Sequence, residues 1–318
     1  MSTAEPESIA PPTVVGGCPL CRVATRARFA AITAEETGET FTVEECPRCG
    51  LGRTRPVPAD LGPYYDSAYY GRRHGWTARL CHRRRLGFVR RWAGPGEGKS
   101  LLDYGCAEGD FLREARSAGW SGVGIERHRP SDALGDVPIV AGLDDLAGRG
   151  PFDCVTFWHV LEHLDDPVGT LERVRRHLKP DGVVLAAVPN FASWQARLTG
   201  PAWLALDIPR HLVHFTPRSL ARTFEAAGFA VGGIAFGEFE YDLIGWSQSV
   251  LNRVGGGRNE FFKAVSGRPN QGSTLRNAVQ IGAGLGLSAL AVGPLVVENW
   301  LGRGGTMIVA ARSSQARG

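Results

Sequence analysis

The sequence predicts an α/β fold built on a mostly parallel sheet, with a small cysteine-rich domain before it and a helical insertion near its end. Three observations favour this. Apolar runs alternate with helical patterns through the middle of the 318-residue chain. Two Cys-x-x-Cys pairs precede that region, and a nearly uncharged stretch from Ala278 to Val297 precedes the last apolar run. The net charge of +4 is too small to indicate a class of partner.

The stretch that organises the chain runs from Leu101 to Asp110, LLDYGCAEGD. The apolar run from Ser100 to Tyr104 is typical of a buried parallel strand. Gly105 and Gly109 follow it, and a helical pattern begins at Phe111. Strand, glycine turn and helix together bring bare backbone against a nucleotide-like ligand.

A second apolar run, Gly122 to Ile125, ends in Glu126, where a Rossmann-like fold holds ribose hydroxyls. A dinucleotide site would use G-x-G-x-x-G and helix amides aimed at a pyrophosphate. Here Asp103 stands beside the turn and would repel phosphate, so a ligand with a ribose and no phosphate suits the site better. A glycine-rich turn without a ligand is the structural alternative.

The spacing D-x-G-x-x-x-G from Asp103 to Gly109, with an acid after the second strand, resembles the S-adenosylmethionine-binding motif of class I methyltransferases. Ala107 replaces the usual middle glycine. Downstream, the FD-x-V … LEHL-x-D-P run from Phe152 and the L-x-R-V-x-x-x-LKPDG run from Leu171 to Gly182 are similar to the group that includes ubiquinone-pathway O-methyltransferases.

The resemblance implies a seven-stranded Rossmann-like sheet over 98–236 plus 305–313, with S-adenosylmethionine as cofactor. It implies that backbone near Leu143, and the Asp144 side chain, contact the adenine, because Gly142 stands where relatives often carry an acid. Cys106 and Cys154 are interpreted as small core residues, not nucleophiles. The expected cofactor-binding residues are Asp103, Gly105, Cys106, Ala107, Gly109, Glu126, Leu143, Asp144 and Trp158.

The two Cys-x-x-Cys pairs stand 24 residues apart and are separated by short β-type runs. Four thiolates from two such pairs, Cys18, Cys21, Cys46 and Cys49, make the closed tetrahedral site that structural zinc prefers. A redox role would need a thioredoxin-like context, which this region lacks. We therefore expect a zinc ribbon with a connection over 18–71, in which tyrosines either floor the active site or pack the domains together. This layout also resembles that of sugar C-methyltransferases.

The segment 72–97 is predicted to be a basic amphipathic helix. From Arg72 to Arg91 it holds eight arginines and no acidic residue, with apolar residues at helical spacing. Its basic face could be solvated, bind an anionic substrate or contact an anionic membrane surface. Specific nucleic-acid binding is not expected.

Methyl transfer to a hydroxyl needs a base that titrates near neutrality, which favours histidine. His159 and His163 follow the fourth predicted strand, and His211 and His214 follow the fifth. Sugar C-methyltransferases carry a Tyr-His-Glu-His run whose last histidine matches His211, so His211 is the candidate base. The tyrosine and glutamate of that run are missing, which argues against the same C-methylation. His214 is expected to be structural.

His159, Glu162 and His163 align with the Glu-x-x-Glu-His segment of ubiquinone-type relatives. The resemblance implies a divalent cation there that acidifies a catechol hydroxyl, and His159 in place of the first glutamate makes the ligand set softer. The catalytic candidates are therefore His211, His163, His159 and Glu162. A histidine at a helix start, bonded to backbone, is the structural interpretation of His163.

Residues 237–304 are predicted to form a helical insertion before the closing strand at Thr306 to Ala311, in which 278–297 forms a lid of two short helices. The 20 residues from Ala278 to Val297 are long enough to cross a bilayer but contain glycines and Pro294. A single span would also separate the closing strand from its sheet. The insertion could instead dip into a membrane interface, as could the arginine-rich helix.

The chain is thus expected to be a cytoplasmic S-adenosylmethionine-dependent methyltransferase, with peripheral contact to the inner membrane face left open. Residues 1–17 should form a disordered tail, because they lack the basic start and apolar core of a signal peptide. The acceptor is expected to be small or carrier-linked, such as a sugar, glycolipid or natural-product intermediate. The alternative is a catalytically silent module that binds a partner or nucleic acid through the ribbon and the arginine-rich helix.

Overall fold

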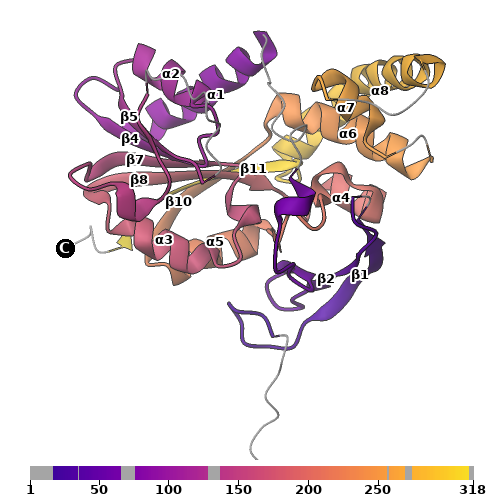
Figure 1. Cartoon of the computed structure of the whole chain (residues 1–318), viewed down its shortest axis with the longest axis horizontal. Helices are drawn as coiled ribbons and strands as arrows, with labels where there is room; N and C mark the ends of the chain where they lie inside the picture. The colour runs from indigo at the N-terminus through magenta and orange to yellow at the C-terminus, as the bar shows by residue number, and fades with distance from the viewer. Residues whose placement is uncertain are drawn as a thin grey trace, which may run out of the picture.

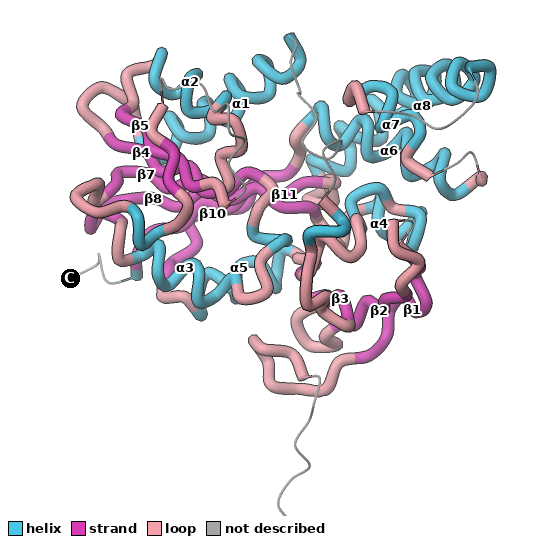
Figure 2. The backbone as a smooth tube through the Cα atoms, in the orientation of Figure 1, coloured by secondary structure: helices cyan, strands magenta, loops and turns pink. Residues whose placement is uncertain are grey.

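The computed structural model describes residues 17–34, 36–65, 76–127, 137–255, 258–268 and 274–314. Two sheets organise these residues, as Figure 1 and Figure 2 show, and a group of three helices stands beside them. The predicted tail, apart from Gly17, and the first four residues of the predicted basic helix lie outside the described residues.

A seven-stranded sheet forms the centre of the molecule in the order β10-β11-β8-β7-β4-β5-β6. Strands β4 to β8 pair in parallel, whereas β11 is antiparallel to both of its neighbours. This order confirms the predicted Rossmann-like sheet and its closing strand. The strands are β4 Ser100–Tyr104, β5 Ser121–Ile125, β6 Ile139–Val140, β7 Phe152–Trp158, β8 Leu178–Pro189, β10 Phe229–Phe236 and β11 Thr306–Ser313.

Helices cover both faces of this sheet (Figure 1). On one side lie α1, Trp76–Ala93, and α2, Asp110–Ser117; on the other lie α3, Pro167–Arg175, and α5, Pro217–Ala226. Successive strand residues alternate between the two cores, as expected for a buried strand: Leu101 packs with α1 and α2, and Leu102 with α3 and α5. The short elements are α4 Trp194–Thr199 and the 3₁₀ helices Gly62–Tyr64, Leu143–Asp145, Leu161–His163, Gly200–Ala202 and Leu204–Leu206.

The second sheet has the order β1-β2-β3-β9 and is antiparallel throughout. Its first three strands, β1 Arg26–Thr33, β2 Thr40–Glu45 and β3 Gly52–Arg55, belong to the cysteine-rich region. The fourth, β9 Val213–His214, lies between β8 and α5 of the large domain. The ribbon is therefore not a separate module: its sheet is completed by the segment that carries the predicted base.

The insertion after β10 forms a hairpin of helices that projects from the edge of the large sheet (Figure 1). It consists of α6 Phe239–Arg253, α7 Glu260–Val265 and α8 Thr274–Trp300. The base of the hairpin is closed by a hydrogen bond from Gly237 N to Thr306 O at 3.0 Å.

The prediction of two short helices over 278–297 is wrong, because α8 continues through all 27 of its residues with Pro294 inside it. Glycine costs a helix only about 1 kcal/mol relative to alanine, so packing can override it. At Gly284 the packing needs the glycine: a Cβ there would lie 2.3 Å from a ring carbon of Phe261 in α7. Pro294 does remove one hydrogen bond, yet it does not end the helix.

Candidate active site

The glycine turn after β4 folds back on the neighbouring strand. The backbone amides of Gly105 and Cys106 both donate to Ile125 O, at 2.8 and 3.1 Å. Gly105 has φ +75°, and a Cβ on it would lie 2.4 Å from Val160, so this position needs glycine. Gly109, with φ +79°, caps the N-terminus of α2. The turn therefore presents bare backbone at the edge where open α/β sheets bind their ligands.

Glu126 and Ala107 meet across this turn. Glu126 follows β5, and its Oε2 accepts a hydrogen bond from Ala107 N at 3.0 Å. Ala107 has φ +47°, in the left-handed region that glycine adopts without penalty. The left-handed backbone at Ala107 thus explains why glycine is the usual residue in the middle of this motif.

Asp103 lies beneath the turn and is buried, and it accepts a hydrogen bond from Thr156 Oγ1 at 2.7 Å. Burial raises the pKa of Asp103 to about 7, against the opposing effect of the Thr156 hydrogen bond. A cation bound at this edge would stabilise the charged form of the carboxylate. The site therefore suits a positively charged ligand, as a sulfonium is.

The remaining expected cofactor residues occupy different environments. Leu143 is buried at the start of its 3₁₀ helix, whereas Asp144 is exposed and pairs with Arg173 at 2.9 Å. Trp158 is buried at the end of β7, edge-on to Phe111 at 5.4 Å. Cys106 and Cys154 are buried, as predicted, and burial raises the pKa of both thiols above the usual range.

A second group of polar side chains lies beyond the end of β7. His163 Nδ1 is 3.0 Å from Arg210 O and 3.0 Å from Tyr65 Oη, and His211 Nδ1 is 2.9 Å from Ala205 O. Because a carbonyl oxygen can only accept, both Nδ1 atoms carry protons and both Nε2 atoms keep a lone pair when the rings are neutral. The two rings meet edge to face at 4.7 Å.

Glu162 completes this group. Its side chain is 1% exposed, and neither carboxylate oxygen has a hydrogen-bond partner among the described residues. Burial alone would raise the pKa of Glu162, but His159 and His163 outweigh it and lower the pKa. Glu162, His163 and His211 each offer one ligand atom, and these atoms lie within 4.8 Å of one another. They could hold a divalent cation.

His159 is not one of these three possible ligands, but the structure does place it beside Glu162, because its Nδ1 lies 3.5 Å from Glu162 Oε1. Its Nε2 lies 2.6 Å from Glu238 Oε2, and its ring stacks on Tyr241 at 4.5 Å. Burial would lower the pKa of His159, but the charge of Glu238 raises it to about 10. Glu238 in turn accepts a hydrogen bond from Arg85 Nε at 2.7 Å. His159 therefore lies inside a buried ion-pair chain that runs from Arg85 through Glu238 to Glu162.

Sequence reasoning missed Glu238 and Arg85. Glu238 stands just before α6, in a segment interpreted only as a lid. Arg85 is buried, whereas the arginines of α1 were considered as a single basic face. An arginine at a position where α1 should be apolar was the available signal, since a buried arginine requires a partner.

The cysteine-rich region holds the segment that contains His211 and His214. Thr54, in β3, donates to His211 O at 2.6 Å and is 3.0 Å from His214 Nε2. His214 is buried, and burial, then the charge of His211, lowers its pKa to about 3. His214 is thus a neutral packing residue, and β3 fixes the backbone from which His211 extends.

The four cysteines of the ribbon form a compact buried cluster. Their ligand atoms all lie within 4.8 Å of one another, and Cys18 Sγ is 3.7 Å from Cys49 Sγ. A tetrahedral zinc site with bonds of about 2.3 Å has sulfur–sulfur edges of about 3.8 Å. The cluster therefore fits a structural zinc ion. Thr216, the N-cap of α5, donates to Cys49 O at 3.0 Å, which ties the cluster to the large domain.

Comparison with known proteins gives a consistent result. Residues 75–232 match a family described as a methyltransferase domain. The ubiquinone biosynthesis O-methyltransferase of Aromatoleum aromaticum is 26% identical over 188 residues, which cover 54% of this chain and 76% of that protein. The enzyme of the same name from Idiomarina loihiensis is 29% identical over 175 residues, covering 48% of this chain and 71% of that protein.

A solved S-adenosylmethionine-dependent methyltransferase from Archaeoglobus fulgidus aligns with a TM-score of 0.43 at 19% identity, covering 73% of this chain and 94% of that one. The family match spans the glycine turn, Glu126, Glu162 and His211. Together with the strand order and the geometry of the turn, it shows that the chain belongs to the class I S-adenosylmethionine-dependent methyltransferases.

Proposed function

We propose that the chain methylates an oxygen atom of a small or carrier-linked acceptor, such as a sugar, glycolipid or natural-product intermediate. The observation that carries the proposal is the buried group of Glu162, His163 and His211, in which two histidines offer Nε2 lone pairs beside a buried carboxylate. The names of the two relatives, both O-methyltransferases, support oxygen as the nucleophile.

The residues of this chain divide the work into positioning and proton removal. When bound, S-adenosylmethionine supplies an electrophilic methyl group on a sulfonium, and residues 105–109 with Glu126 would hold it. His211 Nε2 accepts the proton of the acceptor hydroxyl, and the Glu162 carboxylate stabilises the imidazolium that results. Alignment of the two reactants contributes about 7–11 kcal/mol.

His163 is the less suitable of the two bases. Burial, followed by the charge of His211, lowers the pKa of His163 to about 4. It therefore stays neutral at pH 7, and its contacts with Tyr65 and Arg210 orient it against His211. The same three side chains would also suit a divalent cation, which would acidify a hydroxyl bound to it.

The test is an acceptor screen with S-adenosylmethionine that carries a labelled methyl group. Alcohols, phenols and sugars are compared with carbon acids, and product linkage is read by NMR, which separates O-methyl from C-methyl groups. We expect O-methyl products, and retention of activity in a chelator would assign proton removal to the histidines alone. Transfer to carbon would overturn the proposal, and tight cofactor binding without transfer to any acceptor would favour the silent binding module.

A further inference from the structure

In the hairpin of α6 to α8, helix α8 exposes apolar side chains to solvent and turns several polar side chains inward. A surface helix of a soluble domain turns its apolar side chains inward and its polar ones to solvent. In α8 the polar residues after Arg276 lie on the inward stripe: Asn277, Gln280, Ser288, Glu298 and Asn299 are all buried or half-buried. Apart from Arg276, the exposed large side chains of α8 are apolar, namely Leu275, Val279, Ile281, Leu285, Leu290, Val292, Val296, Val297 and Trp300.

The inward polar groups are bonded within the hairpin and its base. Ser247 in α6 and Ser288 in α8 are linked at 2.7 Å. Gln195 donates to Glu298 Oε1 at 3.3 Å and to Asp242 O at 3.1 Å, joining α8, α6 and α4. Buried apolar side chains such as Phe261, Ala291 and Leu295 accompany these polar groups inside the hairpin. An apolar exterior with polar groups turned inward is the arrangement of helices whose surroundings are less polar than water.

The exposed apolar surface is large. Helix α8 is about 40 Å long at 1.5 Å per residue. Its segment Leu275–Trp300 has a mean hydropathy of 1.7 in its most apolar window, of which only 22% is buried. By length and composition it is the one helix in the described part of the chain that could cross a membrane. Apolar patches of this extent mark contact sites.

The connections of the hairpin exclude a single crossing by α8. Helix α6 leaves the sheet directly after β10, and α8 returns directly to β11, the neighbouring strand. The two helices run antiparallel, because Asp242 and Glu298 meet at the base while Ser247 and Ser288 meet further out. Such a hairpin can enter one leaflet and leave by the same side.

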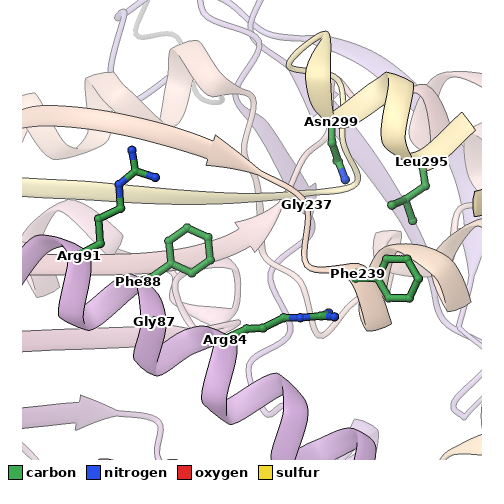
Figure 3. A pocket seen from close by; sticks show the side chains of 8 residues that line it. All are labelled: Arg84, Gly87, Phe88, Arg91, Gly237, Phe239, Leu295 and Asn299. Atoms are coloured by element: carbon green, nitrogen blue, oxygen red, sulfur yellow. The ribbon is translucent and has the colours of Figure 1, made fainter. Parts of the chain in front are cut away.

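Positive charge lies beside this surface. Figure 3 shows a hollow of about 420 Å³ between α1, the start of α6 and the end of α8. It is lined by Arg84 and Arg91 together with apolar side chains, including Phe88 and Leu295. Helix α1 carries six arginines and no acidic residue over Trp76–Ala93. Arg83, Arg84 and Arg85 pair with glutamates of other elements, whereas Arg79, Arg90 and Arg91 are exposed. The Arg91 guanidinium beside the apolar lining of the hollow complements an anionic headgroup and its acyl chain.

We propose that the exposed apolar face of the α6–α8 hairpin and the arginines of α1 dock the protein on an anionic phospholipid bilayer. The apolar side chains of α8 enter the acyl region of one leaflet, and the hollow beside Arg91 receives a phosphate headgroup. This surface is distinct from the buried group around Glu162, so it does not depend on the proposed methyl acceptor.

The test is flotation of the full chain with phosphatidylcholine vesicles that contain or lack phosphatidylglycerol. Leu290 and Val296 are 76% and 60% exposed, so Leu290→Glu with Val296→Glu changes the surface and leaves the core intact. The matched control is Leu198→Glu, on α4, where the leucine is 62% exposed. Binding of S-adenosylhomocysteine verifies that each variant is folded.

We expect the wild type and Leu198→Glu to float with phosphatidylglycerol vesicles, and the double variant to bind at least roughly tenfold more weakly, given the apolar area removed from lipid contact. Arg91→Ala should weaken binding to phosphatidylglycerol vesicles about fivefold and leave the weaker binding to pure phosphatidylcholine unchanged. Equal wild-type binding to both vesicles would overturn the anionic-lipid assignment.

Two results would overturn the docking surface itself. One is a wild-type protein that stays with neither kind of vesicle. The other is a wild-type dimer in sedimentation without lipid that the double variant converts to a monomer, while neither protein floats. That second result would assign the apolar face to a second copy of the chain.

Discussion

The two halves of the active-site edge are built in different ways. The cofactor half uses one short stretch, in which the turn from Gly105 to Gly109 meets Glu126 only 19 residues from Ala107. The acceptor half brings together Tyr65, His163 and His211 from three distant parts of the chain, held from outside by the ribbon strand β3. Because the residues of the first half are close together in sequence, they can be recognised as a motif. The residues of the second half come together only when the chain folds.

The largest difference between the two halves should appear when the proposed metal site is removed. Cys46→Ser should abolish zinc binding, which supplies about 10–16 kcal/mol of folding free energy in isolated zinc peptides. Loss of the ribbon would release β9 and with it His211, so turnover should be lost. S-adenosylhomocysteine binding should persist, because the glycine turn follows β4 of the large sheet, whereas the ribbon strands pair in the other sheet.

Metal analysis, turnover and calorimetry of the same preparation check this prediction. The control is Cys154→Ser, which alters a buried cysteine of the large sheet and leaves the cluster intact. Full zinc occupancy in Cys46→Ser would contradict the four-cysteine assignment, and an equal loss of cofactor affinity would contradict the division into two halves.

The second effect should be confined to the acceptor half. His211→Ala removes the proposed base, so kcat should fall by about 10²- to 10⁴-fold. Cofactor affinity should stay within a factor of a few. Single-turnover rates with the acceptor found in the screen measure the first, and calorimetry measures the second. A near-normal rate between pH 6 and 9 would remove His211 as the base.

The third effect should be confined to the cofactor half. If Glu126 holds the ribose hydroxyls, Glu126→Ala should weaken S-adenosylhomocysteine by about 1.5–3 kcal/mol, the range for hydrogen bonds to charged groups. In the free protein Glu126 also bonds Ala107 N, so the variant loses part of the support of the turn. Glu126→Gln, which keeps an acceptor oxygen, should lose less. Unchanged affinity in folded Glu126→Ala would disprove the ribose role.

The sequence predicted the large sheet because each of its strands is a short apolar run bounded by turn residues, and the order of the motifs fixed their neighbours. The start of α5 is likewise marked locally in the sequence, by Thr216 at its N-cap and Pro217 after it, since capping depends on residues close together in sequence. The resemblance also placed His159 with Glu162, and their side chains lie 3.5 Å apart. By contrast, the shorter contact of His159 with Glu238, 79 residues away, is a pairing that local patterns do not contain.

The insertion shows a different limit. Its glycines and proline predicted a break, because local propensity disfavours them inside a helix. The contact of Phe261 with Gly284 instead makes one of those glycines a packing requirement of a continuous helix. The pairing of Arg85 with Glu238 was missed for the same reason: the partner lies beyond the reach of any local pattern.

A smaller effect concerns the packing histidine of the acceptor half. His214 is buried with its pKa lowered to about 3, whereas an unfolded chain takes up the proton near pH 6.5. The unfolded state therefore binds more protons below pH 6.5, and stability should fall as the pH drops. By pH 5 His214 should account for about 1–2 kcal/mol of that loss. Urea unfolding of His214→Ala should show a correspondingly flatter pH profile, and parallel profiles would contradict the buried neutral form.

The smallest effect tests the one irregular residue of the cofactor motif. Ala107 holds φ +47°, a left-handed conformation in which its Cβ costs roughly 1 kcal/mol. Glycine at this position would remove that cost but would add conformational entropy to the unfolded chain, which offsets part of the gain. We therefore expect Ala107→Gly to raise the free energy of unfolding by no more than about 1 kcal/mol and to leave kcat unchanged. A glycine at Leu143, which is buried at the same edge, would give no such gain, because the backbone of Leu143 is not in the left-handed region. Urea unfolding with and without S-adenosylhomocysteine measures the free energy of unfolding of the free and the ligand-bound protein. A destabilised variant would mean that contacts of the Ala107 methyl group outweigh its backbone strain, so that this departure from the motif stabilises the turn.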